Sequence, residues 1–168
     1  MRTFFLLLLL LALPRFVWAE QKSEYEMKTA YLYNFALFVE WPEETFDTFF
    51  ICVFGDKEPF ASSFSVIENK TIRGKRIAVL QTASLSSLKK CHVLFVAERE
   101  SHQMDRIAKE VAGQPVLTVT ESPRAVGSII RLSFDNHRLV FDIDPEQVDK
   151  SKLKFSYKLL NLARNLRK

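Results

Sequence analysis

The segment that most constrains how this chain folds is residues 28–42, which read KTAYLYNFALFVEWP. Its apolar and aromatic residues recur at spacings of three and four, the period of an α-helix. Ser23 can cap the start, so we predict a helix over residues 24–39. Pro42 ends it, because the residue before a proline is pushed out of the helical conformation. Apolar residues also occur on the other faces, so this helix is buried on most sides or lies at an interface.

The rest of the chain alternates short apolar strands with helical segments. We predict strands over residues 49–54, 76–81, 91–97 and 115–120, a hairpin of 129–134 with 138–143, and helices over 59–68, 101–112 and 152–166. The alternation indicates an α/β fold, and the late hairpin makes its sheet mixed rather than purely parallel. The prediction is a single-domain layered sandwich, in which helices flank a mixed central β-sheet.

The first residues have the order of a secretory signal. Arg2 gives a positive start, residues 4–13 are an unbroken apolar run, and Ala19 offers a small residue for cleavage. Ten residues at ~1.5 Å each cover only about half of a ~30 Å bilayer core, so we favour cleavage after Ala19 over a retained membrane anchor. The prediction is a signal peptide over residues 1–19 and one exported domain over residues 20–168. The formal charge of +4 includes two arginines of the signal peptide, and we expect no nucleic-acid partner.

Cys52 and Cys91 are the only cysteines of the chain. An even number of cysteines in an exported protein favours a disulfide, which would close a loop of about 40 residues and stabilise the fold by roughly 4 kcal/mol. The alternative is a pair of separate buried thiols. A zinc site is disfavoured because the paired ligand spacing is missing, and we expect no metal.

No stretch of the sequence carries a recognisable catalytic motif. The nucleophile elbow, the phosphate-binding loop and the dinucleotide fingerprint are all absent. The three histidines, His92, His102 and His137, are scattered over a strand, a helix and a turn. Asp142 and Asp144 would share one face of a strand, but this pair lacks a partner base or metal. We therefore expect no enzyme activity and no cofactor, which leaves a binding or regulatory role.

Several segments together resemble the YfiR-like family of bacterial periplasmic proteins. They are the K-x-A-Y-L-Y-N-F-A-x-F-V-x-W-P stretch at 28–42, and segments 51–56, 91–96, 117–119 and 159–163. The resemblance implies an α/β sandwich without catalytic activity, located in the periplasm. It also implies a regulator that binds and represses the periplasmic sensor region of an inner-membrane signalling protein. In the best-understood members this partner is a diguanylate cyclase, which connects the family to cyclic di-GMP and biofilm formation.

The family's partners vary, and so do two of its sequence features. Other members lie beside sensor kinases, an outer-membrane lipoprotein can relieve repression, and a homodimer is an open possibility. The family carries a disulfide in the two segments that hold Cys52 and Cys91. Many members have a Gly-Gly pair where this chain has Val126-Gly127-Ser128, and some have a second cysteine pair that is missing here.

Two further functions remain as alternatives to the regulator. The first is a periplasmic small-molecule binding protein with an aromatic pocket, and the second is a hydrolase with an unrecognised site. The candidate partner- or ligand-binding residues lie on the first helix and just after it: Tyr31, Asn34, Phe35, Phe38 and Trp41. The same aromatic side chains can instead be part of the hydrophobic core.

Overall fold

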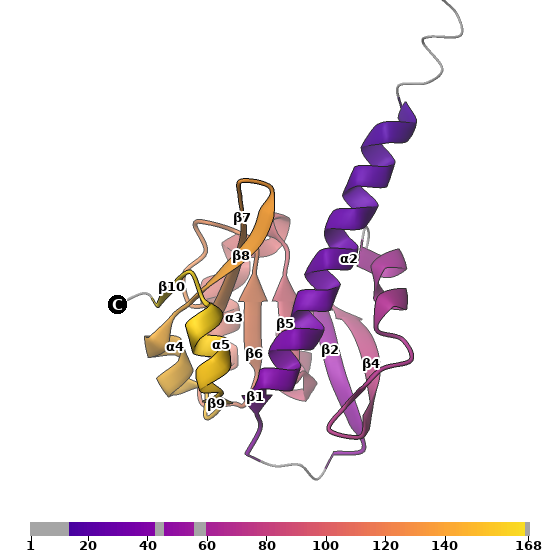
Figure 1. Ribbon diagram of the computed structural model, residues 1–168. Coiled ribbons are helices and arrows are strands. Elements are labelled where there is room, and N and C mark those ends of the chain that lie inside the picture. Colours follow the sequence, from indigo (N-terminus) through magenta and orange to yellow (C-terminus); the bar gives the residue numbers. More distant parts are fainter. Residues whose placement is uncertain (1–13, 43–45, 56–59, 167–168) are drawn as a thin grey trace, which may run out of the picture.

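The structure, a computed structural model, describes residues 14–42, 46–55 and 60–166, and its centre is an eight-stranded sheet (Figure 1). The strand order is β10-β8-β7-β6-β5-β2-β4-β3. The strands are β2 (Thr48–Phe54), β3 (Thr71–Ile72), β4 (Lys75–Thr82), β5 (Val93–Val96), β6 (Leu117–Thr120), β7 (Ile130–Asp135), β8 (Arg138–Ile143) and β10 (Asn165–Leu166). Strands β4, β2, β5, β6 and β7 run parallel to one another. Strands β3 and β8 pair antiparallel with β4 and β7, and β10 pairs parallel with β8. The predicted mixed α/β sheet is confirmed.

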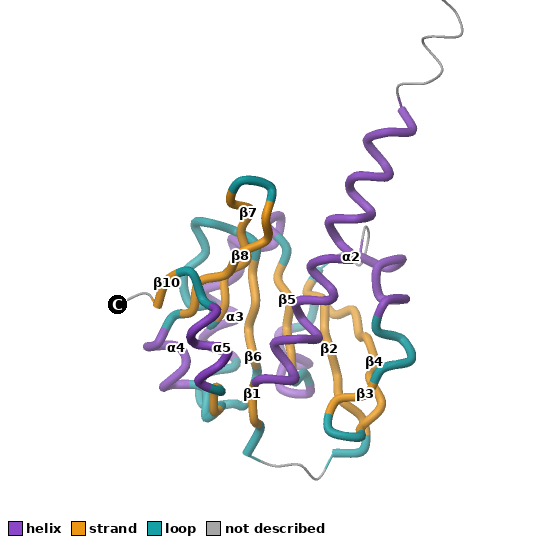
Figure 2. Tube along the Cα trace, in the orientation of Figure 1, coloured by secondary structure: helices purple, strands orange, loops and turns teal. Residues whose placement is uncertain are grey.

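Helices cover both faces of this sheet (Figure 2). They are α2 (Pro14–Phe38), α3 (Met104–Glu110), α4 (Pro145–Lys150) and α5 (Tyr157–Leu162), with 3-10 helices η1 (Phe60–Val66), η2 (Leu85–Lys90) and η3 (Glu98–Gln103). Alternate residues of β2 serve the two faces. Phe49 and Ile51 belong to the larger core cluster with α2, whereas Cys52 and Phe54 belong to a second cluster with α3. The fold is therefore a layered sandwich with a core on each side of the sheet.

The first helix is longer than the sequence predicts. It begins at Pro14, where proline suits the first helical turn, so Ser23 lies within the helix and does not cap it. It ends at Phe38 because the next two residues form β1 (Val39–Glu40), which pairs antiparallel with β9 (Lys154–Phe155). The apolar run of residues 4–13 lies outside the described residues, and cleavage after Ala19 stays a prediction. Within the described part of the chain, no helix combines the length and apolarity needed to cross a bilayer.

The predicted helix over residues 152–166 is wrong. The segment forms β9, then the short helix α5, then β10. Lys152 has a φ of 58°, which interrupts a helix, and the pairing of β9 with β1 fixes the next residues as strand. Ser156 then caps α5, because its side chain accepts a hydrogen bond from the Leu159 N–H at 3.2 Å. Tertiary pairing overrides the helical pattern of leucines.

The predicted hairpin is confirmed as β7 and β8. Its turn residues Asn136 and His137 have φ values of 46° and 62°, as the tight turns that suit twisted strands require. The strand predicted over 91–97 begins two residues late, at Val93. The helix predicted over 101–112 is split into η3 and α3. Of the helix predicted over 59–68, the described residues form the 3-10 helix η1.

Candidate functional site

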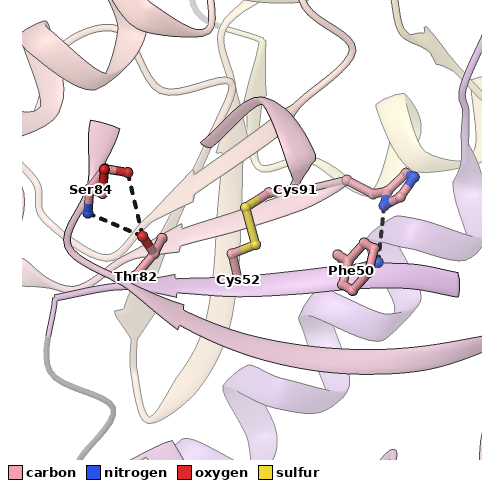
Figure 3. Close-up of a disulfide and its surroundings, with 6 residues drawn as sticks. Phe50, Cys52, Thr82, Ser84 and Cys91 are labelled. Atoms are coloured by element: carbon pink, nitrogen blue, oxygen red, sulfur yellow. Dashed lines mark hydrogen bonds between the residues drawn. A yellow bond between two sulfur atoms is a disulfide. The ribbon is translucent and has the colours of Figure 1, made fainter. Parts of the chain in front are cut away.

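The predicted disulfide is present between Cys52 and Cys91 (Figure 3). Cys52 lies in the middle of β2 and Cys91 directly follows η2, with a Cα–Cα distance of 5.8 Å. The two cysteines are 0% and 4% exposed, within the core cluster on the α3 face. Because solvent thiols cannot easily reach buried sulfur atoms, this burial favours a structural role over redox sensing.

His92, next to the bridge, is half-buried and packs among aromatic rings. Its Nδ1 accepts a hydrogen bond from the Phe50 N–H at 2.9 Å (Figure 3). Its ring stacks on Phe49 with centroids 4.6 Å apart. Burial lowers the pKa of His92 to about 4, so its ring is neutral near pH 7. In the described residues no three His, Cys, Asp or Glu side chains are grouped as metal ligands.

A groove of about 600 Å³ lies between α2, β8 and the C-terminal segment. Four of the five candidate residues line it from α2: Tyr31, Asn34, Phe35 and Phe38. The remaining lining comes from β8 and from the segment around α5: Leu139, Val140, Phe141, Lys158, Leu159, Leu162 and Arg164. We call this the α2–β8 groove.

Trp41 is separate from the α2–β8 groove. It is 5% exposed, its ring meets Phe49 edge-on at 4.9 Å, and its Nε1 donates a hydrogen bond to the Pro115 carbonyl at 2.8 Å. Helix α2 ends three residues earlier, so Trp41 does not share its groove-facing side. The structure thus places Trp41 in the core.

The aromatic floor of the groove is preformed. Phe35 lies edge-to-face with Phe141 at 4.9 Å and with Tyr31 at 5.8 Å. The Tyr31 hydroxyl donates a hydrogen bond to the Leu139 carbonyl at 2.9 Å, which fixes the ring against β8. Such edge-to-face pairs add to the stability of a packed cluster. The groove therefore offers an ordered apolar surface.

Cationic side chains lie at the α5 end of the groove. Lys158 places its Nζ 5.2 Å from the centroid of Phe38. Arg164 donates two hydrogen bonds to Asp142, from Nε at 3.1 Å and from a terminal nitrogen at 2.7 Å, and Asn165 donates a third at 3.1 Å. Asp142 is 3% exposed, and its hydrogen bond raises the pKa of Arg164. The groove thus combines aromatic walls with a cationic rim.

A buried charge cluster joins α2 to the end of β6. Lys28 is only 4% exposed and forms ion pairs with Glu24 and Glu121. Burial acts to lower the pKa of Lys28, but the attraction of Glu121 and Glu24 outweighs it, so the pKa is raised. Lys28 also lies 4.8 Å from the ring of Tyr25. The lysine that opens the 28–42 stretch therefore orients the helix on the sheet.

Sequence reasoning reached only the α2 wall of the groove. It missed the lining residues of β8 and of the C-terminal segment, as well as the pairing of Lys28 with Glu121. A lysine inside an apolar helical stripe was the one local signal of a buried ion pair. The other residues are more than 90 positions away in the chain and meet α2 only in the folded protein.

Fold and site together define a small, disulfide-bonded α/β domain with a preformed aromatic groove. The model of the YfiR/HmsC-like family matches residues 25–164. The chain therefore belongs to the YfiR/HmsC-like family. The match begins inside α2 and ends at Arg164, so it includes strands β2 to β8 of the sheet, the disulfide and both walls of the groove, but not β10. The resemblance stated from the sequence is confirmed.

Proposed function

We propose that the protein is a non-enzymatic periplasmic regulator, which binds and represses the periplasmic sensor region of an inner-membrane signalling protein. A diguanylate cyclase is the favoured partner and a sensor kinase the second choice. Relief of repression by an outer-membrane lipoprotein belongs to the same proposal. The observation that carries it is the family match over residues 25–164. Membership in this family implies a periplasmic regulator, which in the best-understood members acts on cyclic di-GMP signalling.

Three features support the proposal: the first concerns the compartment and the other two concern the binding of a partner. A buried disulfide is typical of proteins that fold in an oxidising compartment. The α2–β8 groove presents ordered aromatic walls, and aromatic side chains are enriched at interface cores. Leu162 is 59% exposed on one wall, and neighbouring Tyr157 is 78% exposed. Leu162 lines the groove, so its exposed side chain extends the apolar surface that Phe38 and Phe141 form there.

The test is affinity capture from envelope extract with two matched variants. Leu162→Asp places a charge in the groove, whereas Val126→Asp makes the same change at a residue that is 75% exposed outside it. We expect the wild type and Val126→Asp to capture a membrane protein with a cyclase or kinase domain, and Leu162→Asp to lose it. Equal capture by both variants would count against the groove as the binding site. If no capture contains such a membrane protein, the regulatory function is contradicted.

The groove also supports a second function, binding of a small aromatic molecule. Its volume of about 600 Å³ is within the range of ligand sites, and its lining is mainly apolar with a few polar groups. A ligand that binds the folded state raises the melting temperature. We expect aromatic compounds to raise it for the wild type but not for Phe38→Ala if this function holds. If no compound in a panel of small aromatic molecules changes the melting temperature, the small-molecule function is excluded and the regulatory function is the one that remains.

A further inference from the structure

The edge of β8 that faces away from β7 is covered by a short strand and by one tyrosine side chain. The strand beside it is β10, which within the described residues is two residues long and pairs, in parallel, with the last two residues of β8. Earlier along the same edge, the Leu139 carbonyl accepts its hydrogen bond from the Tyr31 hydroxyl, at 2.9 Å. The Phe141 carbonyl accepts from the Arg164 N–H at 2.8 Å. One side chain and a short chain end thus take the place of a full neighbouring strand.

The chain end that covers this edge, residues 163–166, is held mainly by polar contacts. We call it the C-terminal strap. Both residues of β10 are exposed, and Leu166 is 52% exposed, so the strap buries little apolar surface. Leu159, 2% exposed, anchors the preceding helix α5 independently of the strap. Ala163 is the one strap residue that packs against the core cluster, so the strap is fastened chiefly through its hydrogen bonds to Asp142 and to the Phe141 carbonyl. A segment that makes the same hydrogen bonds can take its place while Leu159 holds α5.

The buried carboxylate restricts what can replace the strap. Asp142 is 3% exposed and accepts three hydrogen bonds from Arg164 and Asn165 of the strap, and breaking hydrogen bonds to a buried charge without replacing them is destabilising. A replacement must therefore bring a basic side chain, ideally arginine, which matches a carboxylate with two parallel hydrogen bonds. The apolar α2–β8 groove begins at the neighbouring residues Val140 and Phe141. An apolar side chain on the same replacing segment would enter it.

We propose that the outer edge of β8 is a strand-addition site, which the C-terminal strap occupies in the free protein. The signalling partner takes this site with an extended segment that carries a basic side chain for Asp142 and an apolar side chain for the groove. Addition of a strand to a sheet edge is a recurrent mode of peptide recognition. The inference rests on the proposed function and specifies the chemistry of the partner's contact.

The first test uses a fluorescein-labelled peptide with the sequence of residues 160–168, LNLARNLRK, and the full chain. Arg164→Ala weakens the chain's own strap, so this variant should bind the peptide about tenfold more tightly than the wild type, because more of its sites are open. A peptide with alanine in place of its first arginine should not bind. Adding Asp142→Asn to the variant should abolish the gain. Equal weak binding by all proteins overturns the inference.

The second test needs no variant. In amide hydrogen exchange of the wild type, the Arg164 and Leu166 amides should exchange about 100-fold faster than those of the β7–β8 ladder, since the strap opens locally. Equal protection overturns the inference. Neither readout involves cyclic di-GMP, so the two proposals fail separately. A peptide that does not bind leaves the regulator standing, whereas an unchanged nucleotide level after gene deletion leaves the peptide result intact.

Discussion

Removal of the Cys52–Cys91 bridge should cost a large part of the stability of the domain. The bridge spans 39 residues in sequence, and in the chain-entropy model closure of such a loop contributes about 4 kcal/mol. Alanine is the suitable replacement because both cysteines are buried. A serine hydroxyl at either position would have to find a hydrogen-bond partner inside the core. The free energy of unfolding of such a domain is roughly 5–15 kcal/mol, so the double variant Cys52→Ala/Cys91→Ala should be only marginally stable.

Urea denaturation, followed by far-UV circular dichroism, measures this loss directly. Cys91→Ala alone is the matched control, and it should lose as much as the double variant because either change breaks the bridge. A loss below about 1 kcal/mol in the double variant would refute the loop-closure reasoning. Partner capture separates the two roles of the bridge. A structural bridge predicts lower protein abundance, whereas a redox sensor predicts a reduced protein that stays folded but releases its partner.

Three further predictions concern single residues. Gly127→Ala should destabilise by about 1–3 kcal/mol, since its φ is +95° and the new Cβ would lie 2.8 Å from Ala108; Gly74→Ala, with open space around it, should lose less in the same urea assay. As pH falls from 6.5 to about 4, the free energy of unfolding should decline, because His92 binds a proton in the unfolded state but stays neutral in the folded state. His92→Gln should flatten this part of the plot of stability against pH. Lys28→Met should cost about 3 kcal/mol, partly recovered when Glu121→Gln removes the stranded carboxylate.

Local patterns predicted the elements whose stability is local. The period of α2 placed Tyr31 and Phe35 on one side of a helix, and both line the same groove. The β7–β8 hairpin followed from alternating residues around a turn that tolerates positive φ. The disulfide followed from the number of cysteines and the expected compartment. In each case a short-range rule and the tertiary structure agree.

Features that depend on distant parts of the chain were missed. The leucines after Lys152 indicate a helix, but pairing of β9 with β1 and the hydrogen bonds of Arg164 to Asp142 fix another conformation. The groove's second wall comes from β8 and α5, which no periodicity relates to α2. Trp41 was grouped with the groove because it is adjacent in sequence. The helix ends before it, and the indole hydrogen-bonds elsewhere in the core.

The measurement that most directly tests the regulator is the cellular level of cyclic di-GMP in a strain without the gene, complemented with matched variants. If the protein represses a cyclase, the level should be raised in the deletion strain. Wild type and Val126→Asp should restore the low level, whereas Leu162→Asp, which alters the α2–β8 groove, should not. A level that deletion leaves unchanged while a cyclase with a periplasmic sensor is active, or full restoration by Leu162→Asp at equal abundance, would contradict the account.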